Sequence, residues 1–84
     1  MSEKSVEDRV KEIIAEVLEA DVNSIKDETR FVEDLHIKSP DVLELIAALE
    51  DEFGIEITLA ESMRNKTVKD AIECVKRKLQ RRTG

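Results

Sequence analysis

Three long segments of this chain carry apolar residues at helical spacing, and no stretch alternates apolar and polar residues for long enough to form a strand. The segments are residues 5–19, residues 39–53 and a segment that begins at Thr67. Each helix would expose an apolar face if it stood alone, so the three must pack together. We therefore expect an all-α fold, a small antiparallel bundle of three main helices plus one short helix around Leu59 to Met63. The stripes expected to form its core are Val6, Val10, Ile13 and Val17; Val42, Leu45, Ile46, Leu49 and Phe53; and Val68, Ala71, Ile72, Val75 and Leu79.

The second of these helices has the most clearly marked ends. Pro40 is favoured at the first helical position and favours an extended conformation at the residue before it, so Ser39 is the expected N-cap. Gly54, directly after Phe53, suits a left-handed C-cap. The other two helices are expected to begin at capping residues placed three positions before an aspartate, Ser5 before Asp8 and Thr67 before Asp70.

The link between the first two helices, residues 20–38, is longer than most helix connections. A long loop in a small domain is usually packed down by apolar side chains. Val22, Ile25, Phe31 and Leu35 are the isolated apolar residues that could do this. We expect Ile25 and Phe31 to be the main anchors.

The chain has 84 residues, which is the size of one small domain. We expect a single domain over residues 1–84, with a core from 5 to 80 and a basic tail at 81–84. Apolar residues make up 40% of the sequence, but there are only two Phe and no Trp or Tyr, so the core must be aliphatic and thin. We place Phe53, Met63 and Cys74 in or beside that core.

Charge is distributed unevenly along the sequence. Residues 31–61 carry one base and nine acids, whereas residues 62–84 carry eight bases and two acids. The anionic middle segment repels nucleic acid and attracts basic protein surfaces, and the basic end lacks the aromatic residues of a nucleic-acid site. The net charge of −6 favours a monomer. No apolar run is long enough to cross a membrane and the single Cys suits a reducing compartment, so we expect a cytoplasmic protein without membrane insertion.

Catalytic and metal-binding patterns are missing from the sequence. One His and one Cys cannot supply a nucleophile, a base and an orienting group together. The two Gly, at positions 54 and 84, form no phosphate-binding loop. We therefore expect neither catalytic residues nor a metal site.

Ser39 is the residue at which a functional interpretation begins. On local sequence alone it is a helix cap, which requires no further chemistry. The surrounding segment, DLHIKSPDVLELIAALEDEFGIEI at residues 34–57, strongly resembles the acyl carrier protein family, whose usual form reads Asp-Leu-Gly-x-Asp-Ser-Leu-Asp before an acidic amphipathic helix. Residues 9–35 resemble the first helix and long loop of that family, and residues 67–75 its last helix. The resemblance thus covers most of the chain.

The resemblance implies a carrier and not an enzyme. In that family the motif serine, here Ser39, is linked to 4'-phosphopantetheine through a phosphodiester, and the thiol of this arm carries acyl groups as thioesters. The implied partners are a phosphopantetheinyl transferase and the acyl-loading and acyl-transferring enzymes of fatty acid, specialised lipid or polyketide biosynthesis. A helix N-terminus stabilises a phosphate by about 0.3–1 kcal/mol, which agrees with this role for Ser39.

The outer face of the second helix is acidic and contains small residues, so another protein could approach it closely. Its charges would guide basic enzyme surfaces toward the arm and would affect the encounter rate more than the affinity. Leu43 is its main apolar contact. The residues that we expect to contact partners are Lys38, Asp41, Leu43, Glu44, Ala47, Glu50, Asp51 and Glu52.

The motif departs from the family pattern around the serine. His36 stands where the family usually has Gly, Lys38 where it has Asp, and Pro40 where it has Leu. These replacements suggest a specialised carrier with dedicated partners, and Lys38 could instead pair with the phosphate. His36 itself is expected to be an exposed loop residue.

Two alternatives stay open on the sequence. A peptidyl or amino-acid carrier would use the same arm for different cargo. An unmodified interaction or scaffold module would keep the bundle without the arm. For an acyl carrier, an aliphatic core could also part to shelter an acyl chain between the helices.

Overall fold

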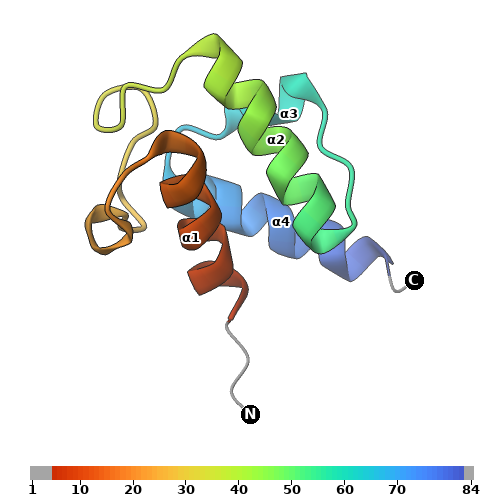
Figure 1. Ribbon diagram of the computed structural model, residues 1–84. Helices are drawn as coiled ribbons and strands as arrows, with labels where there is room; N and C mark the ends of the chain where they lie inside the picture. The colour runs from red at the N-terminus through yellow and green to blue at the C-terminus, as the bar shows by residue number, and fades with distance from the viewer. Residues whose placement is uncertain (1–4, 83–84) are drawn as a thin grey trace.

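The computed structural model describes residues 5–82 and shows that this part of the chain is helical, as predicted. Figure 1 shows α1 and α2 running in opposite directions, with α4 behind them. The short helix α3 follows α2 and leads back to the start of α4. The elements are α1 (Val6–Leu18), the 3-10 helix η1 (Val22–Ser24), α2 (Ser39–Phe53), α3 (Leu59–Arg64) and α4 (Val68–Arg82).

The core forms where the stripes of α1, α2 and α4 meet. Val10 and Ile14 of α1 and Val68 and Val75 of α4 are completely buried, and Leu45 of α2 is nearly so. Each such aliphatic side chain contributes about 1.5–3 kcal/mol when removed from water. The expected aliphatic core is therefore confirmed in the described residues.

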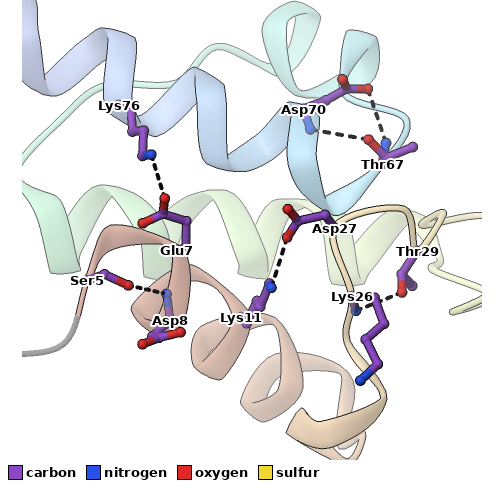
Figure 2. Close-up of polar contacts among 10 residues, drawn as sticks. All are labelled: Ser5, Glu7, Asp8, Lys11, Lys26, Asp27, Thr29, Thr67, Asp70 and Lys76. Atoms are coloured by element: carbon purple, nitrogen blue, oxygen red, sulfur yellow. Dashed lines mark hydrogen bonds and ion pairs between the residues drawn. The ribbon is translucent and has the colours of Figure 1, made fainter.

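The helix ends agree with the capping residues at α1 and α4. The Oγ atom of Ser5 accepts a hydrogen bond of 3.1 Å from the backbone N–H of Asp8. Thr67 Oγ1 accepts from the N–H of Asp70 at 3.2 Å, and the Asp70 carboxylate accepts from the N–H of Thr67 at 3.2 Å (Figure 2). Both caps satisfy N–H groups that have no partner inside the helix.

The long link is packed down by Ile25 and Phe31, as expected, with 2% and 7% of their surfaces exposed. Val22 is 41% exposed, so its expected anchoring role is wrong. It lies at the start of η1, a single turn capped by the side chain of Asp21, and this turn directs Ile25 inward and leaves Val22 in solvent. Leu35 is half-buried.

Polar contacts fix the link and α4 to α1 (Figure 2). Lys11 of α1 pairs with Asp27 of the link at 2.9 Å, and Lys76 of α4 pairs with Glu7 of α1 at 2.6 Å. The hydrogen bond from Lys76 lowers the pKa of Glu7. The side chains of the Lys76 pair are almost half exposed, so this contact adds little stability.

Two expectations need correction in the C-terminal half. Met63 was expected in the core but is 59% exposed, because α3 has only six residues and none of them is buried. Phe53 is half-buried, and Cys74 is buried as expected. The helix α4 continues through Arg82, so residues 81 and 82 are helical and not a tail. The expected tail residues 83 and 84 lie outside the described residues.

Candidate functional site

Ser39 is the first residue of α2, and the N-cap is Lys38. Lys38 has an extended backbone (φ −112°, ψ 166°), and its carbonyl accepts the N–H of Val42 at 3.1 Å. The expectation that Ser39 itself caps the helix is therefore wrong. Proline disfavours the helical conformation at the residue before it but does not exclude it. Ser39 is helical here, so α2 begins one position earlier than Pro40 alone would predict. Asp41 fixes this start, because its carboxylate accepts the N–H of Lys38 at 3.0 Å.

The hydroxyl of Ser39 is consequently free. It is exposed and makes no hydrogen bond to any residue in the range 5–82. It also lies in the first turn of a 15-residue helix, where unpaired N–H groups give a partial positive charge. A phosphate ester on this oxygen would not be blocked by buried neighbouring side chains. It would also not have to displace a hydrogen bond.

The loop that leads to Ser39 is held by the start of α4. The N–H of Phe31 donates to the carbonyl of Lys66 at 3.0 Å, and the N–H of Val68 donates to the carbonyl of Thr29 at 2.9 Å. Farther along, the N–H of Ile37 donates back to the carbonyl of Phe31 at 3.0 Å. The position of Ser39 therefore depends on contacts between segments that are distant in the sequence.

Arg30 and Asp34 close the same loop on its outer side. The Nε atom of Arg30 lies 3.4 Å from Asp34 Oδ2, and the same oxygen accepts the backbone N–H of Arg30 at 2.8 Å. This backbone hydrogen bond, followed by the guanidinium contact, lowers the pKa of Asp34. His36 comes next, is exposed as expected, and has a positive φ of 55°. The left-handed conformation at His36 favours glycine, the residue that the resembled family usually has there.

The outer face of α2 is less uniformly acidic than its sequence suggests. Glu44 and Asp51 are exposed and make no ion pair with a described residue. Leu43, 59% exposed, and the exposed Ala47 lie on the same face. These four residues, which we call the docking stripe, form the part of the outer face of α2 that is free to contact another protein.

The other three carboxylates of the expected partner surface, Asp41, Glu50 and Glu52, have contacts inside the molecule. Glu50 Oε2 accepts the N–H of Ile57 at 2.8 Å, which fixes the chain after α2. Glu52 pairs with Arg9 of α1 at 3.0 Å, and the hydrogen bond from Arg9 lowers the pKa of Glu52. Asp41 holds Lys38, while the exposed Lys38 side chain makes no ion pair in the described range. The sequence predicted one acidic face for all of these carboxylates, because spacing on a helix does not reveal which of them has a partner elsewhere.

A cavity of about 480 Å³ lies beside α2. Its four main walls come from α2, α3, α4 and the loop at residues 30–37, residues 57 and 65–67 complete its lining, and most of this lining is apolar. A shelter between the helices was expected from the sequence, but its lining residues were not, because Val32 and Ile37 belong to the link and Met63 to the short helix. The apolar lining includes Phe31, Val32, Ile37, Val42, Leu45, Ile46, Leu49, Ile57, Met63, Ala71 and Cys74.

The described residues contain neither a metal-binding cluster nor a membrane-spanning helix. Between residues 5 and 82, no three His, Cys, Asp or Glu side chains gather in a way that could hold a metal ion. Within the same range, no helix has both the length and the apolar character needed to cross a membrane.

Comparison with known proteins agrees with this geometry. Residues 8–75 match the family model described as a phosphopantetheine attachment site. The acyl carrier protein of Helicobacter hepaticus is 49% identical over 63 residues, which is 75% of this chain and 83% of that protein. The acyl carrier protein of Lactobacillus acidophilus is 43% identical over 76 residues, which is 90% of this chain and 95% of that protein. A solved structure described as an acyl carrier protein from Mycobacterium tuberculosis matches with a TM-score of 0.79 and 32% identity, over 86% of this chain and 96% of that one.

A small helical bundle that matches a phosphopantetheine attachment model over most of its length defines a carrier domain. This chain belongs to the acyl carrier protein family. It carries acyl groups, and its cofactor is a covalently attached 4'-phosphopantetheine. Proteins of this family are carriers, not catalysts, and interact with the enzymes that modify them and with biosynthetic enzymes.

Proposed function

We propose that Ser39 is the attachment point of the 4'-phosphopantetheine arm. The observation that carries this proposal is the exposed hydroxyl of Ser39, at the first residue of α2, which makes no hydrogen bond to a described residue. The matched range 8–75 contains three serines. Ser24 donates its hydroxyl to the carbonyl of Asp21 at 2.7 Å, and Ser62 lies in the short helix α3 and lines the cavity. Ser39 is thus the serine that a modifying enzyme can reach most directly.

The modification is a transfer from coenzyme A. Ser39 Oγ forms a new ester bond to the phosphorus that carries the pantetheine, and the bond from this phosphorus to the other phosphate of coenzyme A breaks. Adenosine 3',5'-bisphosphate leaves, and the hydroxyl proton passes to the transferase. The arm supplies a terminal thiol, on which acyl groups are held as thioesters. The N-terminus of α2 and the side chain of Lys38 then lie next to a negative charge.

The docking stripe gives this carrier a surface for its partners. Glu44 and Asp51 would attract the basic surfaces of a phosphopantetheinyl transferase and of acyl-loading and acyl-transferring enzymes. Ala47 lies between these charges along α2 and Leu43 lies just before Glu44, and both allow close apolar contact. We assign the protein to fatty acid, specialised lipid or polyketide biosynthesis in the cytoplasm, working as a monomer.

The cavity suits the cargo. Its volume of about 480 Å³ falls within the range of small-ligand pockets, and its lining is mostly apolar. Each methylene buried there contributes about 0.8 kcal/mol before the cost of ordering the chain. Loading with a medium-length acyl group should therefore raise the midpoint of thermal unfolding, whereas no rise would count against a sheltered cargo.

The experiment that tests this function is the mass of the protein before and after incubation with coenzyme A and a phosphopantetheinyl transferase. The wild type should gain one phosphopantetheine on the peptide that contains Ser39, and Ser39→Ala should gain none. A scaffold module would stay unmodified under the same conditions. A peptidyl carrier would be modified, but an adenylating enzyme would load it with an amino acid.

A further inference from the structure

The four walls of the cavity are not held equally firmly. The helices α2 and α4 contribute buried core residues, and the loop wall is joined to α4 through the backbone hydrogen bonds of Phe31 and Val68. The fourth wall, α3, contains six residues, and none of them is buried. Leu59 and Met63, its two large apolar side chains, are 53% and 59% exposed. Hydrophobic burial therefore does little to keep α3 in place.

A polar contact between Glu61 and Lys78 joins α3 to α4. The Nζ atom of Lys78 lies 2.8 Å from Oε1 and 2.7 Å from Oε2 of Glu61. The Lys78 side chain is 18% exposed and the Glu61 side chain 27%, which makes this the least exposed ion pair among the residues described. An ion pair with little solvent access is screened less by salt than one on the open surface.

Glu61 also fixes the start of α3. Its Oε1 atom accepts the N–H of Thr58 at 2.9 Å, and Thr58 Oγ1 accepts the N–H of Glu61 at 3.1 Å. This capping box holds the first turn of α3. One carboxylate thus both starts the helix and links it to α4. Ser62 and Met63, the next two residues, line the cavity.

We propose that the Glu61–Lys78 ion pair holds α3 against the cavity and thereby controls how well the acyl cargo is shielded from solvent. Glu61 and Lys78 are positioning residues in this proposal, since neither touches the thioester. The cargo part of the proposal rests on the proposed function, whereas the attachment of α3 to α4 can be tested in the unmodified protein.

The first measurement is amide hydrogen exchange across residues 59–64 of the unmodified protein. Lys78→Met removes the ion pair, and Glu61→Gln removes the charge but keeps an oxygen that can accept the Thr58 N–H. Both variants should exchange about two to five times faster than the wild type in α3. The double variant should exchange no faster than the single variants, because they remove the same contact. Exchange at the wild-type rate in both single variants would overturn the proposal.

The chain offers a matched control on the same helix. Lys76→Met removes the same charge and also breaks an ion pair, but its partner is Glu7 of α1. Lys76→Met should leave the exchange rate in α3 unchanged. Lys78→Arg, which keeps the positive charge, should exchange at the wild-type rate. Equal acceleration by Lys76→Met and Lys78→Met would show a general loss of stability and would overturn the specific role of Lys78.

The second measurement is the rate at which hydroxylamine cleaves an octanoyl thioester on the arm, giving the hydroxamate and the free thiol. Cleavage should be about two to five times faster in Lys78→Met and unchanged in Lys76→Met. Equal rates in all three proteins would refute the shielding role even where α3 exchanges faster. If the wild type accepted no arm at Ser39, the proposed function would fail, and hydrogen exchange would still decide whether the ion pair holds α3.

Discussion

The backbone N–H of Lys38 donates a hydrogen bond of 3.0 Å to the carboxylate of Asp41. Through this contact Asp41, and not Ser39, secures the start of α2. Stability and modification at this helix end are therefore assigned to two different side chains, which can be tested separately.

Asp41→Ala should lower the free energy of unfolding by about 0.5–2 kcal/mol, because a helix-terminal N–H loses its acceptor. Ser39→Ala should change it by less than about 0.5 kcal/mol, because the Ser39 hydroxyl has no hydrogen-bond partner among residues 5–82. Urea unfolding of the unmodified proteins measures both. A larger loss in Ser39→Ala than in Asp41→Ala would restore the serine as the cap.

His36→Gly should stabilise the unmodified protein by about 0.5–1 kcal/mol. The positive φ of His36 costs a residue with a Cβ atom more than it costs glycine, although glycine loses more entropy on folding. His36→Ala is the matched control, since it removes the imidazole but keeps the Cβ atom. Urea unfolding should therefore show a gain for glycine alone, and a loss of stability in His36→Gly would contradict the strain at this position.

Glu44→Lys and Asp51→Lys should slow association with a phosphopantetheinyl transferase, and the effect should shrink as salt is added. Glu52→Gln should change association much less, because Glu52 is paired with Arg9. Stopped-flow association rates at several salt concentrations distinguish these variants. Equal effects at all three positions would mean that the whole acidic face acts, not the docking stripe.

Ala71→Leu should reduce the thermal stabilisation that follows acyl loading, because Ala71 is 4% exposed and lines the cavity. Ala47→Leu adds the same atoms on the exposed outer face and should leave that stabilisation unchanged. The quantity to measure is the difference in unfolding midpoint between the loaded and unloaded forms of each variant. An undiminished difference in Ala71→Leu would place the cargo elsewhere.

The Glu61 carboxyl should contribute to acid sensitivity. The hydrogen bond from Lys78, followed by that from the Thr58 N–H, lowers its pKa from 4.5 to about 2. A lowered folded-state pKa stabilises the protein above pH 4.5, and this stabilisation is lost as the pH falls toward 2. The stability difference between the wild type and Lys78→Met should therefore shrink over this interval in urea unfolding at constant salt. A difference that stays constant from pH 5 to pH 2 would show that this ion pair does not set the pKa of Glu61.

The sequence was most informative where a pattern is local. Helical spacing predicted all four α-helices, and the pairs Ser5 with Asp8 and Thr67 with Asp70 predicted two of their starts. The resemblance around residues 34–57 predicted the family, which the comparisons confirm.

The errors arose where the outcome depends on contacts between distant segments. Exposure of Met63 depends on how a six-residue helix lies on α2 and α4, and Glu52 is engaged because Arg9 of α1 lies beside it. Predicting Lys38 as the N-cap would have required the position of the Asp41 side chain, which helix propensities do not determine. The cavity is lined by residues from several segments that are distant in the sequence, so a cavity between helices could be predicted but its lining residues could not.

The most direct test of the central claim is peptide mass spectrometry of the wild type after incubation with coenzyme A and a phosphopantetheinyl transferase. The added phosphopantetheine should be found on the peptide that contains Ser39, and Ser39→Ala should stay unmodified at unchanged stability. An arm found on Ser24 or Ser62, or a wild type that stays bare with its own transferase, would contradict the assignment of Ser39.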